Sequence, residues 1–297
     1  MEQLRSCSYY NLVRYGEENL YKHRKDDEFM ENNLHINADR FLGFANVYDN
    51  ARPKCPEKVK EILLKYLGKS PSVVVDLGCG TGLSTTIWSE VSNKIIGIEP
   101  SKDMIKLAIE KASDLDNVNF VSGFSDNTGL ENSSVDIITC SQSFHWMNPE
   151  TTLNEVSRIL KKGGIFAVYD CDWPPVCNWE AEFEYKKLFE KVTEIESTYP
   201  NVKDSFIKWD KENHLSNIKN SLNFRYVREI VFSNTEICNA QRFIEIALSQ
   251  GGLQSIIKSN IDEINPFILA FKEKIIDIFG TVEFKIDFCY RMRIGVK

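Results

Sequence analysis

The chain of 297 residues carries 36 Lys and Arg against 43 Asp and Glu, which gives a net charge of −7. At about 150 residues per domain, this length predicts about two domains or one large domain with insertions. Hydrophobic residues make up 42% and charged residues 27%, a composition that argues against disorder. The acidic balance lacks the electrostatic footprint of proteins that bind nucleic acid or anionic lipid, so we expect neither partner.

Further absences in the sequence narrow the class of protein. No apolar run of about 18 residues predicts a membrane span, and the N-terminus has no apolar core for a signal peptide. The eight cysteines are scattered without a C-x-x-C pair and are expected to be reduced thiols. The four histidines are too far apart in sequence to suggest a zinc site. We therefore expect a cytoplasmic, metal-free protein.

The first elements are a leader and a helix. Residues 1–40 are polar and charged, and we interpret them as a partly ordered leader or as a lid over a site. From Pro56 the apolar residues fall at i, i+3, i+4, i+7 and i+8, which predicts an amphipathic helix that ends at Gly68.

From residue 73 short apolar runs alternate with helical stretches. The runs lie at 73–75, 95–98, 118–121, 135–140 and 165–169. The helical stretches are one through Ile87 and Trp88, one near 101–113, and one over 153–160 closed by Gly163 and Gly164. Buried strands alternating with helices are typical of a parallel sheet covered on both faces.

After about residue 172 the alternation ends. Residues 180–220 and 236–280 have a helical pattern, and 224–232 is a weaker strand candidate. Residues 282–294 alternate between apolar and polar side chains, which predicts a strand with one buried face.

The glycine turn after the first strand is the strongest functional signal. Gly78, Gly80 and Gly82 follow Asp76, and glycine allows both positive φ and close approach of a ligand to the backbone. The spacing departs from the dinucleotide motif, because Leu83 stands where its third glycine belongs, and a phosphate loop would need a lysine. A carboxylate this close would repel a pyrophosphate and suits a ligand with positive charge.

The second strand ends in Glu99, which lies 23 residues after Asp76. A carboxylate at the carboxyl edge of such a sheet can accept hydrogen bonds from both hydroxyls of a ribose. The two acids together indicate a nucleoside cofactor that carries a positive charge.

These motifs resemble the cofactor site of class I S-adenosylmethionine-dependent methyltransferases. The resemblance rests on Asp76-Leu-Gly-Cys-Gly-Thr-Gly82 and Gly97-Ile-Glu-Pro-Ser101, and continues through 123–130, 135–146 and 155–164. Residues 44–53, with the pair His145-Trp146, are most similar to the subgroup that includes trans-aconitate methyltransferases. The resemblance covers roughly 41–172 and is weak over 173–280. It implies an α/β fold, a doubly wound, seven-stranded, mostly parallel Rossmann-like sheet with a helical cap and an antiparallel strand at 282–294.

The resemblance also implies a division of the chain. Residues 1–55 would be a leader and a segment covering the cofactor, and 56–172 the S-adenosylmethionine-binding core. Residues 173–280 would form a mainly helical substrate cap, and 281–297 a strand that completes the core sheet.

By the same resemblance, individual residues acquire expected roles toward the cofactor. Asp76 would face its ammonium group directly or through water, and Glu99 would bind the ribose. Met104 would pack beside the adenine, with Asp126 as a partner of its amino group. The full set expected at the cofactor is Asp76, Gly78, Cys79, Gly80, Glu99, Pro100, Met104, Ser125, Asp126, Ser141 and Gln142, the last two beside the sulfonium.

The acceptor side is less defined by the sequence. His145 is the candidate catalytic base, needed only if the nucleophile arrives protonated; it is equally a positioning or packing residue. Arg52 would pair with the methionine carboxylate or with an acidic substrate. Arg291 and Arg293 on the last strand also favour an anionic acceptor. The expected substrate residues are Tyr48, Arg52, Trp146, Tyr169 and Trp173.

The predicted function is methyl transfer from S-adenosyl-L-methionine to a small-molecule acceptor, with a carboxylate as one option. Two alternatives stay open, an S-adenosylmethionine-binding protein without transferase activity and a nicotinamide-dependent oxidoreductase. A nucleic-acid methyltransferase would place Asn/Asp-Pro-Pro-aromatic after the fourth strand to hold a flipped base, where this chain has Ser141-Gln-Ser-Phe. The acceptor's identity, the oligomeric state and the role of residues 1–40 do not follow from the sequence.

Overall fold

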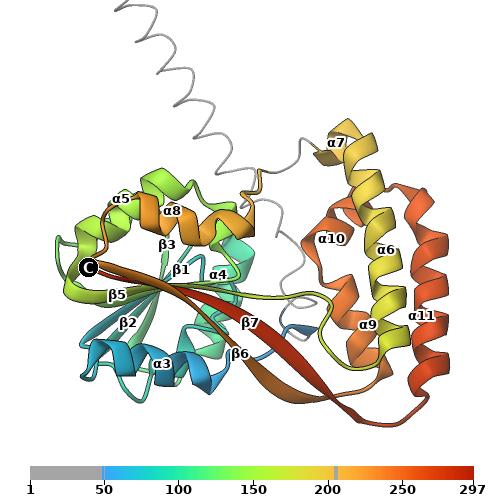
Figure 1. The fold of residues 1–297 in the computed structure, drawn as a ribbon, viewed down its shortest axis with the longest axis horizontal. Coiled ribbons are helices and arrows are strands. Elements are labelled where there is room, and N and C mark those ends of the chain that lie inside the picture. Colours follow the sequence, from blue (N-terminus) through green and yellow to red (C-terminus); the bar gives the residue numbers. More distant parts are fainter. Residues whose placement is uncertain (1–48, 50, 204–206) are drawn as a thin grey trace, which may run out of the picture.

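A seven-stranded sheet with the strand order β3-β2-β1-β4-β5-β7-β6 forms the centre of the molecule (Figure 1). The computed structural model describes residues 49, 51–203 and 207–297. Strands β1 to β5 pair in parallel, and β7 is antiparallel to both β5 and β6. This confirms the predicted seven-stranded, mostly parallel sheet and its antiparallel last strand. The strands are β1 Val73–Leu77, β2 Lys94–Glu99, β3 Val118–Ser122, β4 Val135–Ser141, β5 Leu160–Cys171, β6 Tyr226–Cys238 and β7 Phe284–Val296.

The apolar strands bury both of their faces because successive side chains point to opposite sides of the sheet. Val74 belongs to the core that includes Val59 and Leu63 of α3, whereas Val75 belongs to the core that includes Leu153 and Val156 of α5. The helices are α3 Glu57–Leu67, α4 Lys102–Lys111, α5 Pro149–Ile159, α6 Trp179–Thr198, α7 Pro200–Lys203, α8 His214–Asn220, α9 Ala240–Leu248, α10 Gly251–Lys258 and α11 Asn265–Phe279.

Local chemistry sets the ends of two helices, and the end at Gly68 is the one that the sequence predicted. Gly68 ends α3 with φ of 74°, and its N–H donates to the carbonyl of Leu64, the usual use of glycine after a helix. Asn148 begins α5, where its side chain accepts hydrogen bonds from the N–H groups of Glu150 and Thr151.

The structure corrects two predicted helices. The helix expected through Ile87 and Trp88 is only a 3-10 turn, η1 (Thr86–Trp88), preceded by Ser84 and Thr85, whose hydroxyls donate to Asp76. Side chains bonded in this way compete with regular helix formation. The helix expected to continue to Gly163 ends at Ile159, because β5 already begins at Leu160.

Beyond β5, helices α6, α9, α10 and α11 form a cap beside the sheet, and the long strands β6 and β7 run from the sheet to it (Figure 1). Tyr185, Phe243 and Phe271 are buried where three of these helices meet. The weak strand predicted at 224–232 is a strand, and it extends to Cys238. Among the described helices, none combines the length and the hydropathy that crossing a membrane requires.

Candidate active site

A cavity of about 810 Å³ lies between the carboxyl ends of β1, β2, β4 and β5 and the helical cap. This is the edge at which open α/β sheets bind ligands, and the volume is within the usual range of about 300–1,000 Å³ for ligand pockets. The glycine turn lines one end, and Tyr185 and Phe189 of α6 line the cap side. The cavity therefore has room for a cofactor together with a small second molecule.

The glycine turn brings the backbone to the cavity wall. Gly78 and Gly80 both have positive φ, 64° and 54°. A Cβ atom on Gly78 would lie 2.7 Å from the Cβ of Ser143 and 2.8 Å from the Cε of Met147, whereas one on Gly80 would meet nothing within 4 Å. Gly78 is thus required by packing, and Gly80 leaves the cavity open next to the main chain.

Glu99 fixes the turn to the end of β2. One carboxylate oxygen accepts the N–H of Gly80 at 2.9 Å, and the other accepts the N–H of Ser101 at 2.9 Å. Burial raises the pKa of this carboxyl to about 7, against the opposing effect of the two N–H donors. Glu99 also lines the cavity, where its remaining lone pairs can accept further hydrogen bonds.

Asp76 is enclosed beneath the turn and is not among the residues that line the cavity. Ser84 and Thr85 donate to one of its carboxylate oxygens at 2.6 and 2.8 Å, and Thr139 donates to the other at 2.8 Å. Burial raises its pKa despite these three donors. Ser84, which the sequence analysis did not single out, does line the cavity, so the hydroxyl of Ser84 connects Asp76 to the cavity wall.

Most of the other expected site residues also meet at the cavity. Asp126 is not part of its lining, so its expected contact with adenine has no support from the pocket geometry, and Tyr48 lies outside the described residues. The lining contains, from the predicted set, Arg52, Gly78, Cys79, Gly80, Glu99, Pro100, Met104, Ser125, Ser141, Gln142, His145, Trp146, Tyr169 and Trp173.

Arg52 connects the covering segment to the cap. Its guanidinium donates to the carbonyl of Ser249 at 3.1 Å and to the side chain of Gln250 at 3.4 Å, and it lies over the ring of Trp173. Three residues upstream, Asp49 accepts a hydrogen bond from the hydroxyl of Thr81 in the glycine turn. The chain before α3 therefore bridges the two walls of the cavity.

Arg291 and Arg293 do not line the cavity, contrary to the expectation that they favour an anionic acceptor there. Arg291 pairs with Asp172 at 3.1 Å, and the buried Arg293 pairs with Glu229 at 2.8 Å. Their charges are compensated by carboxylates because β7 pairs with β5 and β6, which place acids beside them.

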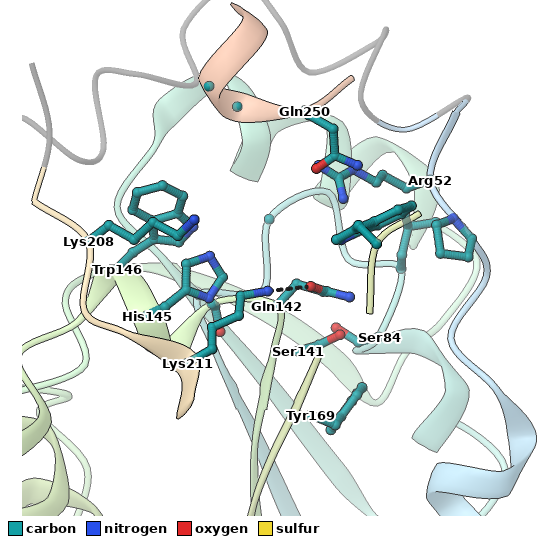
Figure 2. Close-up of a pocket in the computed structure, with 18 of the residues that line it drawn as sticks. Arg52, Ser84, Ser141, Gln142, His145, Trp146, Tyr169, Lys208, Lys211 and Gln250 are labelled. Carbon is teal, nitrogen blue, oxygen red and sulfur yellow. Dashed lines mark hydrogen bonds between the residues drawn. The ribbon is translucent and has the colours of Figure 1, made fainter. Parts of the chain in front are cut away.

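Two lysines that the sequence analysis missed do line the cavity. The Nζ of Lys211 lies 2.9 Å from a carboxylate oxygen of Asp170 and donates to the side chain of Gln142 at 3.3 Å (Figure 2). The Nζ of Lys208 lies 5.9 Å from the ring centroid of Trp146. Both belong to a polar stretch without a recognisable motif, so no signal in the sequence marked them.

His145 stands in the cavity wall between Trp146 and Lys211 (Figure 2). It belongs to the 3-10 turn η2 (Phe144–Trp146) directly after β4, and its Nδ1 lies 3.4 Å from a carboxylate oxygen of Asp170. Burial, followed by the positive charges of Lys211 and Lys208, lowers the pKa of His145 to about 3 against the effect of Asp170. The imidazole is therefore neutral at physiological pH, a state in which it can accept a proton or a hydrogen bond.

Comparison with known proteins agrees with this geometry. Residues 75–168 match the family model of the methyltransferase domain. The probable S-adenosylmethionine-dependent methyltransferase CRG1 of Saccharomyces cerevisiae is 29% identical over 168 residues, which are 51% of this chain and 58% of that protein. The ubiquinone/menaquinone biosynthesis C-methyltransferase UbiE of Campylobacter jejuni is 34% identical over 142 residues, 45% of this chain and 57% of that protein.

The fold superposes on a solved structure from Anaeromyxobacter dehalogenans with a TM-score of 0.62 at 16% identity, covering 82% of this chain and 97% of the other. Residues 75–168 are therefore similar to a methyltransferase domain, the matching relatives are named methyltransferases, and the cofactor that this similarity indicates is S-adenosyl-L-methionine. The chain spans less than two thirds of the length of the curated relatives it matches, between 58% and 66% for three of them. The similarity to the trans-aconitate subgroup stays a prediction.

Proposed function

We propose that the chain transfers a methyl group from S-adenosyl-L-methionine to a small molecule bound in the cavity. The observation that carries this proposal is the continuity of the cavity. Gly80 and Glu99 line one end, while His145 and Lys211 line another part of the same space. A cofactor and an acceptor can therefore meet in one enclosure.

The proposed chemistry is a direct displacement. The acceptor's nucleophilic atom bonds to the methyl carbon as the carbon–sulfur bond breaks, and the electron pair of that bond neutralises the sulfonium. The cofactor is already activated, so the protein chiefly aligns the reacting atoms and excludes water. In this proposal Gly78 and Gly80 abut the methionine part, Glu99 binds the ribose, and Met104 packs beside the adenine.

The acceptor in this proposal carries an acidic oxygen group, either a carboxylate or an acidic hydroxyl. Lys208 and Lys211 line the part of the cavity where His145 lies, Lys211 in an ion pair with Asp170, and the field of the two lysines opposes protonation of the imidazole. A site that disfavours a cation favours an anion for the same electrostatic reason. The apolar body of the acceptor would contact Trp146 and the cap.

The test is the release of S-adenosylhomocysteine with a panel of carboxylates, phenols and amines. With the acceptor found in this way, Lys211→Met should raise its KM by about tenfold to a hundredfold, as expected for a lost charged contact, with the KM for S-adenosylmethionine unchanged. Lys219→Met, on the exposed side of α8, is the matched control. A preference for cationic amines would contradict the acidic acceptor, and binding of S-adenosylhomocysteine without turnover of any acceptor would indicate a binding protein.

A further inference from the structure

Asp170 is the centre of a buried cluster of charged and titratable side chains next to the cavity. It lies at the carboxyl end of β5, is 2% exposed, and is not itself part of the cavity lining. Four side chains from four different elements surround its carboxylate. Their atoms are Nδ1 of His145 at 3.4 Å, Nζ of Lys211 at 2.9 Å, Nε2 of His214 at 3.7 Å and Nη1 of Arg293 at 3.5 Å.

The two oxygens of Asp170 have different neighbours. His145 and Lys211, which line the cavity, approach Oδ1, whereas His214 and Arg293, which do not, approach Oδ2. Oδ1 therefore lies beside the two side chains of the cluster that an acceptor in the cavity can contact. Oδ2 lies against His214 of α8 and Arg293 of β7, and these contacts with packed elements fix the position of Asp170.

His145, Asp170 and His214 also have the composition of a metal site, with donor atoms within 4.8 Å of one another. The ammonium of Lys211 and the guanidinium of Arg293 already lie against the two oxygens of Asp170. A divalent cation bound there would be repelled by both of these charges. The electrostatics therefore argue against metal binding at this cluster.

We propose that Asp170 is a positioning residue for the acceptor: it holds His145 with Nδ1–H toward its carboxylate and holds Lys211 beside Gln142. A proton on Nδ1 leaves the Nε2 of His145 unprotonated, and His145 lines the cavity next to Trp146 (Figure 2). An unprotonated nitrogen beside a positive charge fits an acceptor with an ionisable hydroxyl, such as a phenol or an enol. This inference rests on the proposed function and selects the hydroxyl over the carboxylate.

In this proposal the methyl group is transferred to the oxygen of the acceptor hydroxyl. As the acceptor oxygen bonds to the methyl carbon, its proton passes to Nε2 of His145, which holds it only transiently because the pKa of this imidazole is lowered to about 3, and the carbon–sulfur electron pair goes to sulfur. The products are the methyl ether, S-adenosylhomocysteine and an imidazolium, which returns its proton to water. Asp170 stabilises that imidazolium, and Lys211 stabilises negative charge on the oxygen before transfer.

The tautomer of His145 can be measured without cofactor or acceptor. The chain has only four histidines, so long-range proton–nitrogen correlation spectra of the full chain labelled with ¹⁵N-histidine are tractable, and His145→Gln assigns the signal. We expect a neutral His145 protonated on Nδ1 at pH 7. A His145 protonated on Nε2, or a charged imidazolium, would overturn the inference, as would zinc binding in a titration that shifts both His145 and His214.

Activity gives the second readout. Asp170→Asn should lower kcat for a hydroxyl acceptor by about 10²–10⁴, the usual contribution of a general base, and leave the affinity for S-adenosylhomocysteine within a few fold. Asp172→Asn is the matched control, because Asp172 lies two residues further on, is half exposed and pairs with Arg291 outside the cavity. Equal turnover of Asp170→Asn and wild type would refute the positioning role of Asp170 and leave the proposed function in place. A wild type that turns over no acceptor would refute the proposed function.

Discussion

The carboxylate of Glu99 accepts a hydrogen bond from the backbone N–H of Gly80 at 2.9 Å. This contact joins the end of β2 to the glycine turn that follows β1, and the second oxygen of Glu99 is held by the N–H of Ser101. The acid that we propose for the ribose thus also sets the shape of the turn proposed for the methionine part. The proposed contacts to the ribose and to the methionine part therefore depend on one side chain.

Replacement of Glu99 by glutamine should weaken cofactor binding. The amide presents an NH₂ group where one oxygen now accepts an N–H, so one backbone contact is lost along with the charge. We expect the Kd for S-adenosylhomocysteine, measured by isothermal titration, to rise about tenfold to a hundredfold. Glu150→Gln, on the exposed face of α5, should leave it unchanged. A folded Glu99→Gln protein with wild-type affinity would remove Glu99 from the ribose site.

Cofactor affinity should depend on pH through the same residue. Burial raises the pKa of Glu99 to about 7, so the carboxylate gains a proton as the pH falls through that value. An ionised carboxylate is the stronger acceptor for ribose hydroxyls, and affinity should therefore decrease from pH 8 to pH 6. Titrations at these two pH values check this, and the Glu99→Gln protein should show a flatter dependence. A steeper loss in that variant would assign the pH dependence to another group.

The sequence was sufficient to predict the sheet because its signals are local. The runs at Val74 and Ile95 are short, apolar and rich in β-branched residues, and glycine or acidic residues follow each strand at the carboxyl edge. These patterns predicted the parallel strands, the turn at Gly78 and the position of Glu99. Where local signals compete, as in the stretch after Gly82, the predicted helix was wrong.

The cluster around Asp170 was not predicted, since its members are distant in sequence. His145, Lys211 and Arg293 come from a turn after β4, a turn before α8 and the last strand, and only tertiary structure brings them together. One signal was available: Asp170 is an acid at the end of an apolar strand, as Asp76 and Glu99 are. Periodicity carries no information about which distant cations meet such an acid.

Alanine at Gly78 and at Gly80 should separate folding from binding. Both positions have positive φ, which costs an alanine about 1–2 kcal/mol. Only at Gly78 does the new Cβ overlap Ser143 and Met147, which adds about 1–3 kcal/mol of overpacking. Urea unfolding should therefore show the larger loss of stability for Gly78→Ala, while Gly80→Ala chiefly weakens binding of S-adenosylhomocysteine. Equal losses of stability would contradict the packing that the structure shows.

The free energy of unfolding should fall in mild acid. The pKa values of His145 and His214 are lowered by burial to about 3 and about 4 from 6.5, so between pH 6.5 and 4 the unfolded chain binds protons that the native chain does not. Stability must then decrease as the pH falls through this window. Glu99 and Asp76, whose pKa values burial raises, act in the opposite direction, so the contribution of an imidazole is measured as the difference between wild type and a variant that lacks it.

Urea unfolding of wild type and His145→Gln at pH 7 and pH 5 measures this contribution. The variant lacks one of the two buried imidazoles, so its stability should decrease less between the two pH values. Lys219→Met, remote from the cluster, serves as the control for surface effects. An equal or steeper decrease in His145→Gln would show that His145 is not held neutral by burial.

Isothermal titration of the wild-type chain with S-adenosylhomocysteine, and in parallel with NAD, tests most directly whether the cavity at the carboxyl edge of the sheet holds the methyltransferase cofactor. We predict that one molecule of S-adenosylhomocysteine binds per chain, that NAD does not bind, and that Glu99→Gln weakens the binding observed. Absence of binding by S-adenosylhomocysteine, or binding of NAD in its place, would contradict the account of this site.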